Sequence, residues 1–165
     1  MRLLFIRHAI AIAASGTMRD EDRPLTPEGE QRFRLTARMV ARVAGKPTVL
    51  LTSPHVRAQQ TATIAAQAWG DMRPIVEPAL VQGDWPGICR ALADYKGDDT
   101  VALVGHESWM SMITARLLGS RNHHAFDYRK GGVALIEVED LLACKGTLLW
   151  FIPPRVFRRM DAIPR

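Results

Sequence analysis

Short apolar segments alternate along this chain with longer segments of helical periodicity, and this alternation limits the folds open to it. Each apolar segment is short enough to be a buried β-strand. These segments lie at residues 2–6, 48–52, 75–77, 101–104, 132–138 and 147–152. Helical patterns lie at residues 26–45, 58–69, 87–95 and 108–118. Strands that alternate with helices predict a three-layer α/β/α sandwich with a mainly parallel central sheet.

The length and composition fit one globular domain. The chain has 165 residues, of which 47% are apolar and 24% are charged, and no repeat or linker-like stretch divides it. We therefore expect a single domain over residues 1–165 with one sizeable core. Residues 155–165 are a basic tail, for which we expect packing on the surface. Fraying and a lid over the site are the alternatives.

The formal net charge of +5 suits an enzyme for anionic substrates, a protein that binds acidic partners or a weak nucleic-acid binder. The charge alone does not distinguish these classes. The four tryptophans are too scattered to form a stacking strip, so we expect no nucleic-acid partner. No apolar run approaches the roughly 20 residues of a membrane span, and the two cysteines provide no disulfide framework. We therefore expect a cytoplasmic protein without a membrane partner.

Basic side chains follow three of the predicted strands. Arg7 and His8 come directly after the first strand, Arg57 comes shortly after the second, and His106 follows the strand at 101–104. Ligands of parallel α/β sheets bind beyond the carboxyl ends of the strands. We therefore expect these four side chains at one rim of the sheet.

The residue types at this rim suit phosphoryl transfer. Arginine offers a planar, permanently charged fork that matches phosphate oxygens. A neutral histidine can act as a nucleophile, and a second, protonated histidine can donate a hydrogen bond to a phosphoryl oxygen. Phosphoryl transfer depends on positioning and charge neutralisation, and cationic side chains can supply both without a metal. The Asp/His clusters of a metal-dependent phosphoesterase are absent from the sequence.

Four motifs in a fixed order carry a resemblance to a known family. They are Leu-Phe-Ile-Arg-His-Ala at 4–9, Arg-Pro-Leu-Thr-Pro-Glu-Gly at 23–29, Ser-Pro-x-x-Arg-Ala-Gln-Gln-Thr-Ala at 53–62 and Val-Gly-His-Glu at 104–107. Together they resemble the histidine phosphatase superfamily, also called phosphoglycerate mutase-like, over residues 2–138. The short chain and the phrase Tyr-Arg-Lys-Gly-Gly-Val-Ala at 128–134 are similar to the SixA branch of phosphohistidine phosphatases.

The resemblance implies a phosphoglycerate mutase-like fold and a role for each matching residue. His8 would attack phosphorus and become transiently phosphorylated. Arg7, Arg57 and His106 would surround and neutralise the phosphoryl oxygens, and water would hydrolyse the phosphohistidine intermediate. The resemblance implies no metal and no cofactor. Lys130 is a further candidate for the rim of the pocket, with a solvated loop residue as the alternative.

One departure from the superfamily concerns the acid that protonates the leaving oxygen. The resemblance places Ala79 where many members carry a glutamate. Glu77, Asp84 and Glu107 are the candidate substitutes, although none matches by spacing. An alkoxide leaving group gains about 10²–10⁴-fold from such an acid. Imidazole has a conjugate acid of pKa about 6.5 and can leave without one, so we expect a preference for phosphohistidine over alkyl phosphomonoesters.

We therefore predict an enzyme that hydrolyses protein phosphohistidine through a covalent intermediate at His8, without a metal or a cofactor. One alternative is a phosphatase of small phosphomonoesters. The other is a catalytically weak module that only binds phosphorylated or acidic partners. The pattern indicates no particular oligomeric state.

Overall fold

All six predicted strands are present in the computed structural model, which describes residues 1–161 apart from the side chains of Arg158 and Asp161. The strands are β1 (Arg2–Arg7), β2 (Val49–Thr52), β3 (Ile75–Val76), β4 (Thr100–Gly105), β5 (Val133–Asp140) and β6 (Lys145–Ile152). They form one sheet in the order β3-β2-β4-β1-β5-β6. The first four strands pair in parallel, whereas β5 runs antiparallel to β1 and β6 antiparallel to β5. The predicted mainly parallel sheet is confirmed.

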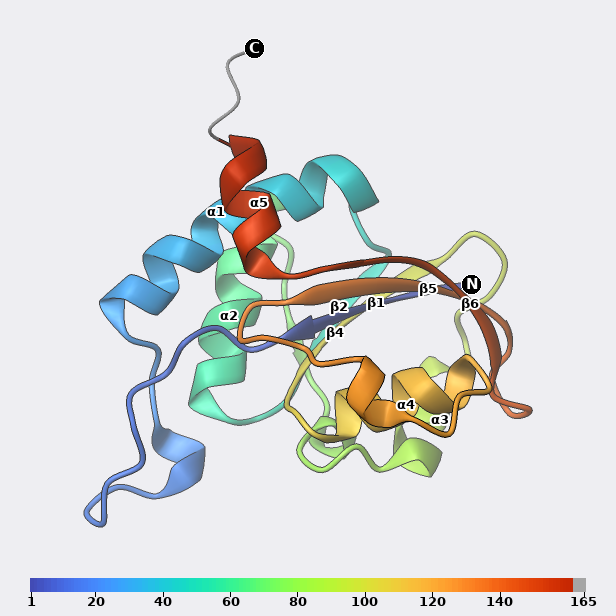
Figure 1. Cartoon of the computed structure of the whole chain (residues 1–165), viewed down its shortest axis with the longest axis horizontal. Coiled ribbons are helices and arrows are strands. Elements are labelled where there is room, and N and C mark those ends of the chain that lie inside the picture. Colours follow the sequence, from blue (N-terminus) through green and yellow to red (C-terminus); the bar gives the residue numbers. More distant parts are fainter. Residues whose placement is uncertain (162–165) are drawn as a thin grey trace.

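Helices cover both faces of this sheet (Figure 1). One layer consists of α1 (Pro27–Ala44), α2 (Val56–Ala68) and α5 (Pro154–Asp161), and the other consists of α3 (Trp85–Leu92) and α4 (Trp109–Leu117). Successive side chains of a strand point to opposite faces, so in β1 Leu4 and Ile6 pack into the first layer while Leu3 and Phe5 pack into the second. A strand buried on both faces reads as a continuous apolar run. The predicted three-layer sandwich is confirmed.

The limits of α1 follow from local sequence chemistry. The Thr26 hydroxyl accepts a hydrogen bond from the Gly29 backbone N–H at 2.9 Å, and Pro27 occupies the first helical position. The helix ends at Gly45, whose φ of +72° is a conformation that glycine adopts without a Cβ penalty. The long loop between β1 and α1 carries the short 3₁₀ turn η1 (Asp20–Asp22). This loop returns to the carboxyl ends of the strands.

The first part of the basic tail is a helix packed on α1. Within α5 the Phe157 side chain is fully buried in the cluster that also contains Phe33 and Ala37 of α1. An aromatic side chain of this size removes a large apolar area from water when buried, so it fixes the helix against the domain. Residues 162–165 of the predicted tail lie outside the described residues. No helix among residues 1–161 is long and apolar enough to cross a membrane.

Candidate active site

His8 follows β1 directly and is held in one orientation by backbone groups. Its backbone N–H donates to the Gly105 carbonyl at 3.0 Å, and its ring Nδ1 lies 2.7 Å from the Ala9 carbonyl oxygen. A carbonyl only accepts hydrogen bonds, so Nδ1 carries the proton and Nε2 keeps its lone pair. Burial, reinforced by the charge of Arg57, lowers the pKa of His8 to about 3. The imidazole is therefore neutral at physiological pH.

His106 lies beside His8 because β4 pairs in parallel with β1. The register places Arg7 opposite Gly105, and the two imidazole rings that follow lie 5.1 Å apart between centroids. His106 Nε2 is 2.8 Å from the Ser53 Oγ, and this hydroxyl also accepts the His55 backbone N–H at 3.3 Å. Burial lowers the pKa of His106 to about 3, so the ring is neutral and only one of its nitrogens carries a proton. Ser53 is fully buried, and His106 Nε2 is the acceptor within reach of its hydroxyl proton among the described residues, so we assign the donor role to Ser53 Oγ. The remaining ring proton then sits on Nδ1.

Arg57 reaches the same rim from the first turn of α2. Its Nη2 donates to Asp20 Oδ2 at 2.8 Å, and its Nη1 donates to the Asp20 carbonyl oxygen at 2.5 Å. Asp20 belongs to η1, so the loop between β1 and α1 holds the guanidinium from one side. The side chain is 6% exposed, and its Nε is buried without a hydrogen-bond partner in the described part of the chain.

Arg7, the last residue of β1, is arranged in the same way. Its Nη1 donates to the Tyr128 carbonyl oxygen, in the segment that leads into β5. Its Nε is buried and has no hydrogen-bond partner within residues 1–161. Burial lowers the pKa of Arg7 from its usual value. The guanidinium is nevertheless a permanent cation at physiological pH.

Three buried N–H groups around His8 thus lack a partner in the described structure: Nε of Arg7, Nε of Arg57 and Nδ1 of His106. More than nine in ten buried polar groups in proteins are hydrogen-bonded, so such a concentration of free donors is unusual. A phosphoryl group carries three oxygens that accept hydrogen bonds from such donors. The structure therefore brings all four predicted site residues together and leaves a set of donors that an oxyanion satisfies.

The structure adds three residues that the sequence reasoning did not select for the site. Asp20 holds Arg57, Ser53 holds His106, and the His55 ring lies 4.8 Å from the His106 ring between centroids. His55 Nδ1 is also buried without a partner among the described residues. Ser53 and His55 follow the second strand directly, and this position was the available signal. Asp20 lies far from any strand end, and only the folded loop brings it to the site.

The three candidate acids are placed differently. The Glu77 carboxylate accepts the Ala79 backbone N–H at 2.9 Å and caps η2 (Pro78–Leu80), and Asp84 is an exposed residue 3.9 Å from Arg90. Glu107 is half-buried beside Arg7, and its Oε2 has no partner in residues 1–161. Burial raises the pKa of Glu107 to about 7. Of the three, Glu107 has a carboxyl group that is available to exchange a proton near neutral pH.

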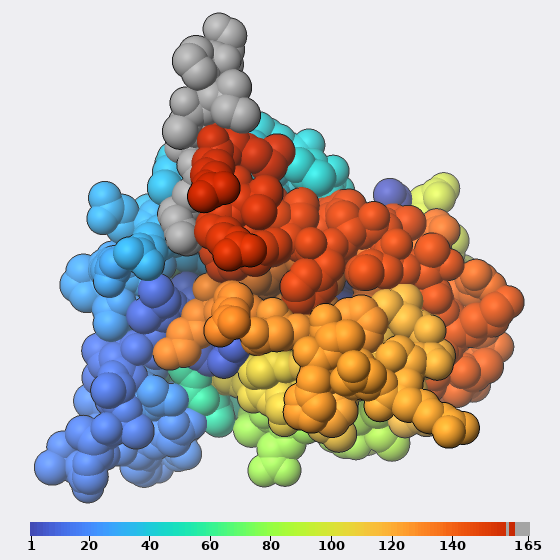
Figure 2. Space-filling view, in the orientation of Figure 1, coloured from blue at the N-terminus to red at the C-terminus, as the bar shows by residue number. Residues whose placement is uncertain are grey.

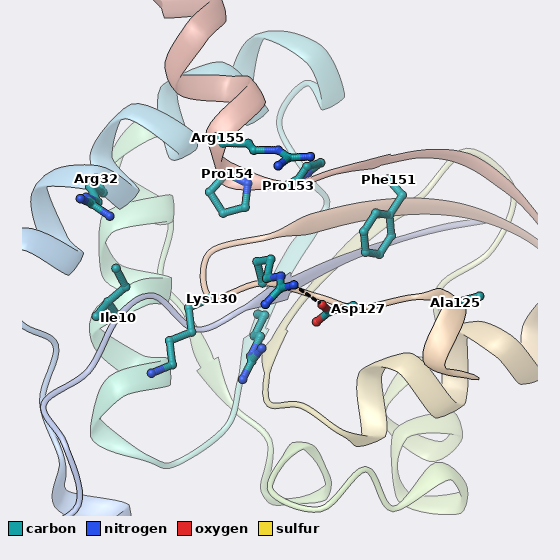
Figure 3. Close-up of a pocket in the computed structure, with 11 residues that line it drawn as sticks. Ile10, Arg32, Ala125, Asp127, Lys130, Phe151, Pro153, Pro154 and Arg155 are labelled. Atoms are coloured by element: carbon teal, nitrogen blue, oxygen red, sulfur yellow. Dashed lines mark ion pairs between the residues drawn. The ribbon is translucent and has the colours of Figure 1, made fainter. Parts of the chain in front are cut away.

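A groove opens from this cluster toward the surface. It has a volume of about 870 Å³ and runs from Arg7 between the segment 125–130, the end of β6 and the start of α5 (Figure 3). Lys130 lies on its wall, as expected for a residue of the rim, and its charge helps to lower the pKa of His8. The carboxyl ends of parallel strands are where α/β proteins bind ligands, and cationic donors at this edge suit an anionic ligand.

Comparisons with known proteins identify the family. Residues 3–89 match the histidine phosphatase superfamily (branch 1). An uncharacterized protein of Picosynechococcus sp. is 34% identical over 140 residues, which cover 81% of this chain and 82% of the relative. The chain belongs to the histidine phosphatase superfamily, branch 1, and is a hydrolase of the phosphatase class. The family assignment made from the motifs is confirmed.

Solved structures share the fold over nearly the whole chain. The protein histidine phosphatase SixA, in complex with tungstate, superposes with a TM-score of 0.79 at 23% identity and covers 94% of this chain and 99% of SixA. A mycobacterial glucosyl-3-phosphoglycerate phosphatase superposes with a TM-score of 0.72 at 16% identity and covers 92% of this chain and 98% of that enzyme. The fold is therefore that of SixA and of phosphatases for small substrates alike.

Proposed function

We propose that the protein is a phosphohistidine phosphatase that uses His8 as its nucleophile. The observation that carries the proposal is the set of three unpartnered N–H groups, from Arg7, Arg57 and His106, beside a neutral imidazole. These donors neutralise the equatorial phosphoryl oxygens as negative charge shifts in the transition state. The charge needed for this step comes from side chains that the fold already holds in place.

The reaction proceeds in two displacements. His8 Nε2 donates its lone pair to phosphorus while the bond from phosphorus to the substrate nitrogen breaks. The substrate imidazole, protonated on its other nitrogen, leaves as a neutral ring. Water then attacks the phosphorylated His8, whose ring leaves as neutral imidazole with its Nδ1 proton still directed to Ala9, and inorganic phosphate is released. Nδ1 keeps one proton throughout, and the Ala9 carbonyl fixes its position.

The residue at position 79 supports this substrate. Ala79 stands where a glutamate would protonate an alkoxide, and a neutral imidazole leaving group needs no such acid. We also propose that the reaction needs no metal, because Arg7, Arg57 and His106 can neutralise the phosphoryl oxygens themselves. The number and spacing of the two cysteines, which provide no disulfide framework, are the basis on which we propose a cytoplasmic location.

Glu107 favours a second candidate function, hydrolysis of a small phosphomonoester. Its carboxyl group lies beside Arg7, and burial raises its pKa to about 7, so it is partly protonated at neutral pH. Such an acid could assist an alkoxide leaving group. The structural likeness to the mycobacterial phosphatase, whose substrate is a small phosphorylated compound, supports the same alternative.

One experiment tests the nucleophile and the substrate together. The protein and its His8→Ala variant are incubated with a phosphohistidine peptide, with glycerol phosphate and with an activated aryl phosphate, each with and without a chelator. We expect turnover of the peptide and the aryl phosphate that resists the chelator and disappears in the variant. Turnover that survives His8→Ala would remove the proposed nucleophile, and loss with chelator would indicate a metal mechanism. Faster hydrolysis of glycerol phosphate would select the second function, and binding without turnover of any compound would select a binding module.

A further inference from the structure

The groove beside Arg7 is larger than the reaction itself requires. Its volume of about 870 Å³ far exceeds the space that one phosphorylated imidazole ring fills. Figure 2 shows the molecule hollowed here, between the orange segment around 125–130 and the red segment of β6 and α5. The groove adjoins the proposed phosphoryl site, with which it shares Arg7. Groups attached to the phosphorylated residue therefore have room to lie in it.

The lining of the groove is strongly cationic. Its positively charged residues are Arg7, Arg32, Arg129, Lys130 and Arg155, and its acidic residue is Asp127. Asp127 is paired with Arg129 at 2.9 Å (Figure 3), and Arg32 is paired with Glu28 on α1. In the described part of the chain no acidic side chain pairs with Lys130 or Arg155. These two exposed cations leave the groove with uncompensated positive charge.

The position of Arg155 is unfavourable for the helix that carries it. Arg155 lies in the first turn of α5, where the positive end of the helix dipole disfavours a cation. The helix contains no acidic residue in this turn to offset it. Phe157, two residues further on, is fully buried and holds α5 in place. The first turn of α5 therefore adds to the positive charge of the groove and does not offset it.

Apolar side chains form the rest of the groove. Ile10, Phe151, Pro153 and Pro154 are half-buried and lie between the charged residues (Figure 3). Proline and phenylalanine offer rigid surfaces against which a backbone or an aliphatic stem can pack at little entropic cost. The combination suits a ligand that carries anionic groups and apolar stems along its length. Aspartate and glutamate side chains on a polypeptide have this character.

A second charged feature lies on the other side of the proposed phosphoryl site. The turn η1 places Asp20, Glu21 and Asp22 next to Arg57, at the end of the loop away from α5 (Figure 1). Asp20 is paired with Arg57 and Arg23, and Glu21 and Asp22 are paired with Arg19. This turn therefore presents no excess positive charge to an acidic ligand, whereas the groove does. The charge distribution therefore favours one direction for an acidic segment that leaves the phosphorylated residue.

We propose that the groove binds an acidic polypeptide segment adjoining the phosphorylated histidine of the substrate protein. The proposal rests on the proposed function, because it identifies which phosphohistidine proteins that site accepts. Arg155 and Lys130 contact the carboxylates of the segment, and Phe151 packs against its apolar stems. Specificity for the partner therefore comes from charge outside the catalytic cluster.

The test compares two phosphohistidine peptides of equal length, one with glutamates on both sides of the histidine and one with glutamines. We expect kcat/KM to be about tenfold higher for the acidic peptide at low salt and the preference to shrink at 0.5 M salt, where screening is nearly complete. The variants Arg155→Glu and Lys130→Glu should each reduce this preference. The matched control is Arg73→Glu, an exposed cation just before β3 at the opposite edge of the sheet, which should keep it.

Each other outcome overturns a defined part of the proposal. Equal rates on the two peptides would overturn the groove assignment and leave the proposed function intact. If Arg73→Glu reduces the preference for the acidic peptide as much as Arg155→Glu does, the preference comes from the net charge of the protein and not from the groove. If the two groove variants instead slow only a small phosphorylated carboxylate such as phosphoglycerate, the groove binds a small anion and not a polypeptide. Failure of either peptide to be hydrolysed in a His8-dependent manner would overturn the proposed function itself.

Discussion

At the scale of single residues, the site is defined by the hydrogen bonds that orient its nitrogen atoms. The Ala9 carbonyl fixes the Nδ1 proton of His8, and Ser53 fixes the tautomer of His106. Asp20 accepts hydrogen bonds from both terminal nitrogens of Arg57, and Nε of Arg57 has no partner among the described residues. In each case a neighbouring group satisfies one side of the functional group, so that the other side is available to phosphate. These neighbours are positioning residues.

The role of Ser53 leads to a prediction for kcat. In Ser53→Ala, His106 loses the donor that keeps the proton on its Nδ1, so the ring can present a lone pair to the phosphoryl oxygens. Loss of such a hydrogen bond to a buried polar group corresponds to about tenfold or more in rate. We expect kcat on an activated aryl phosphate to fall accordingly while KM changes little.

The matched control for this prediction is Ser111→Ala. Ser111 is a buried serine of α4, at 4% exposed, and its contact with the candidate acid Glu107 is through its backbone, which Ser111→Ala retains. Its substitution should leave kcat close to that of the unmodified protein, with a similar melting temperature to Ser53→Ala. Equal values of kcat for the two variants would contradict a positioning role for Ser53.

At the scale of elements, the parallel pairing of β1, β2 and β4 assembles the site, and α5 completes the groove. β4 lies between β2 and β1, so the segments that follow the three strands meet at one edge of the sheet. The groove needs a further wall, which the end of β6 and the start of α5 provide. Among the described side chains of α5, Phe157 is the one that is fully buried, and it anchors this wall.

Removal of this anchor is predicted to destabilise the protein. Phe157 is fully buried, and truncation of a buried phenylalanine to alanine costs about 3–5 kcal/mol. We expect Phe157→Ala to lower the free energy of unfolding in urea by about 3 kcal/mol. The control is Val156→Ala, at a position that is 37% exposed, with a loss below about 1 kcal/mol. Similar losses in the two variants would show that α5 does not contribute to the cooperative core.

At the scale of the whole molecule, burial of the site is coupled to stability. Two histidines, His8 and His106, lie almost completely buried among cations, and both have their pKa lowered to about 3. The folded protein therefore holds them neutral over a pH range in which the unfolded chain protonates them. The proposed nucleophile must be neutral to attack phosphorus. The same neutrality lowers the free energy of unfolding at acidic pH, because the unfolded chain binds protons there and the folded protein does not.

The sign of this coupling gives a prediction for pH. As the pH falls below the ordinary histidine pKa of about 6.5, the unfolded chain binds protons that the folded state does not bind, so stability decreases until about pH 3. The melting temperature should therefore drop between pH 7 and pH 5. In the double variant His8→Asn, His106→Asn the drop should be smaller. Equal drops in the two proteins would show that these histidines titrate alike in the folded and unfolded states.

The fold and the placement of the four candidate site residues at one edge of the sheet were predictable because they depend on local patterns. Apolar runs such as 2–6 and 101–104 determine buried strands, and side chains that directly follow parallel strands gather at one edge whatever the remaining topology. The resemblance in the motifs added their roles. Asp20 was not predictable in this way, since a residue in a long loop has no register with the sheet. Phe157 was missed for a similar reason, because one aromatic residue in a basic segment leaves no periodic pattern.

The sequence by itself therefore determined the α/β architecture, the order of the strands along the chain and the identity of the basic residues at their ends. Only the tertiary structure decided which N–H groups remain free, which carboxylate is available beside Arg7 and where the cationic groove lies. The physical reason is that hydrogen-bond satisfaction, burial and groove shape arise between segments far apart in the chain. Tyr128 and Arg7 are 121 residues apart in the sequence, yet the Tyr128 carbonyl accepts a hydrogen bond from Nη1 of Arg7 while Nε of Arg7 remains without a partner in the described residues.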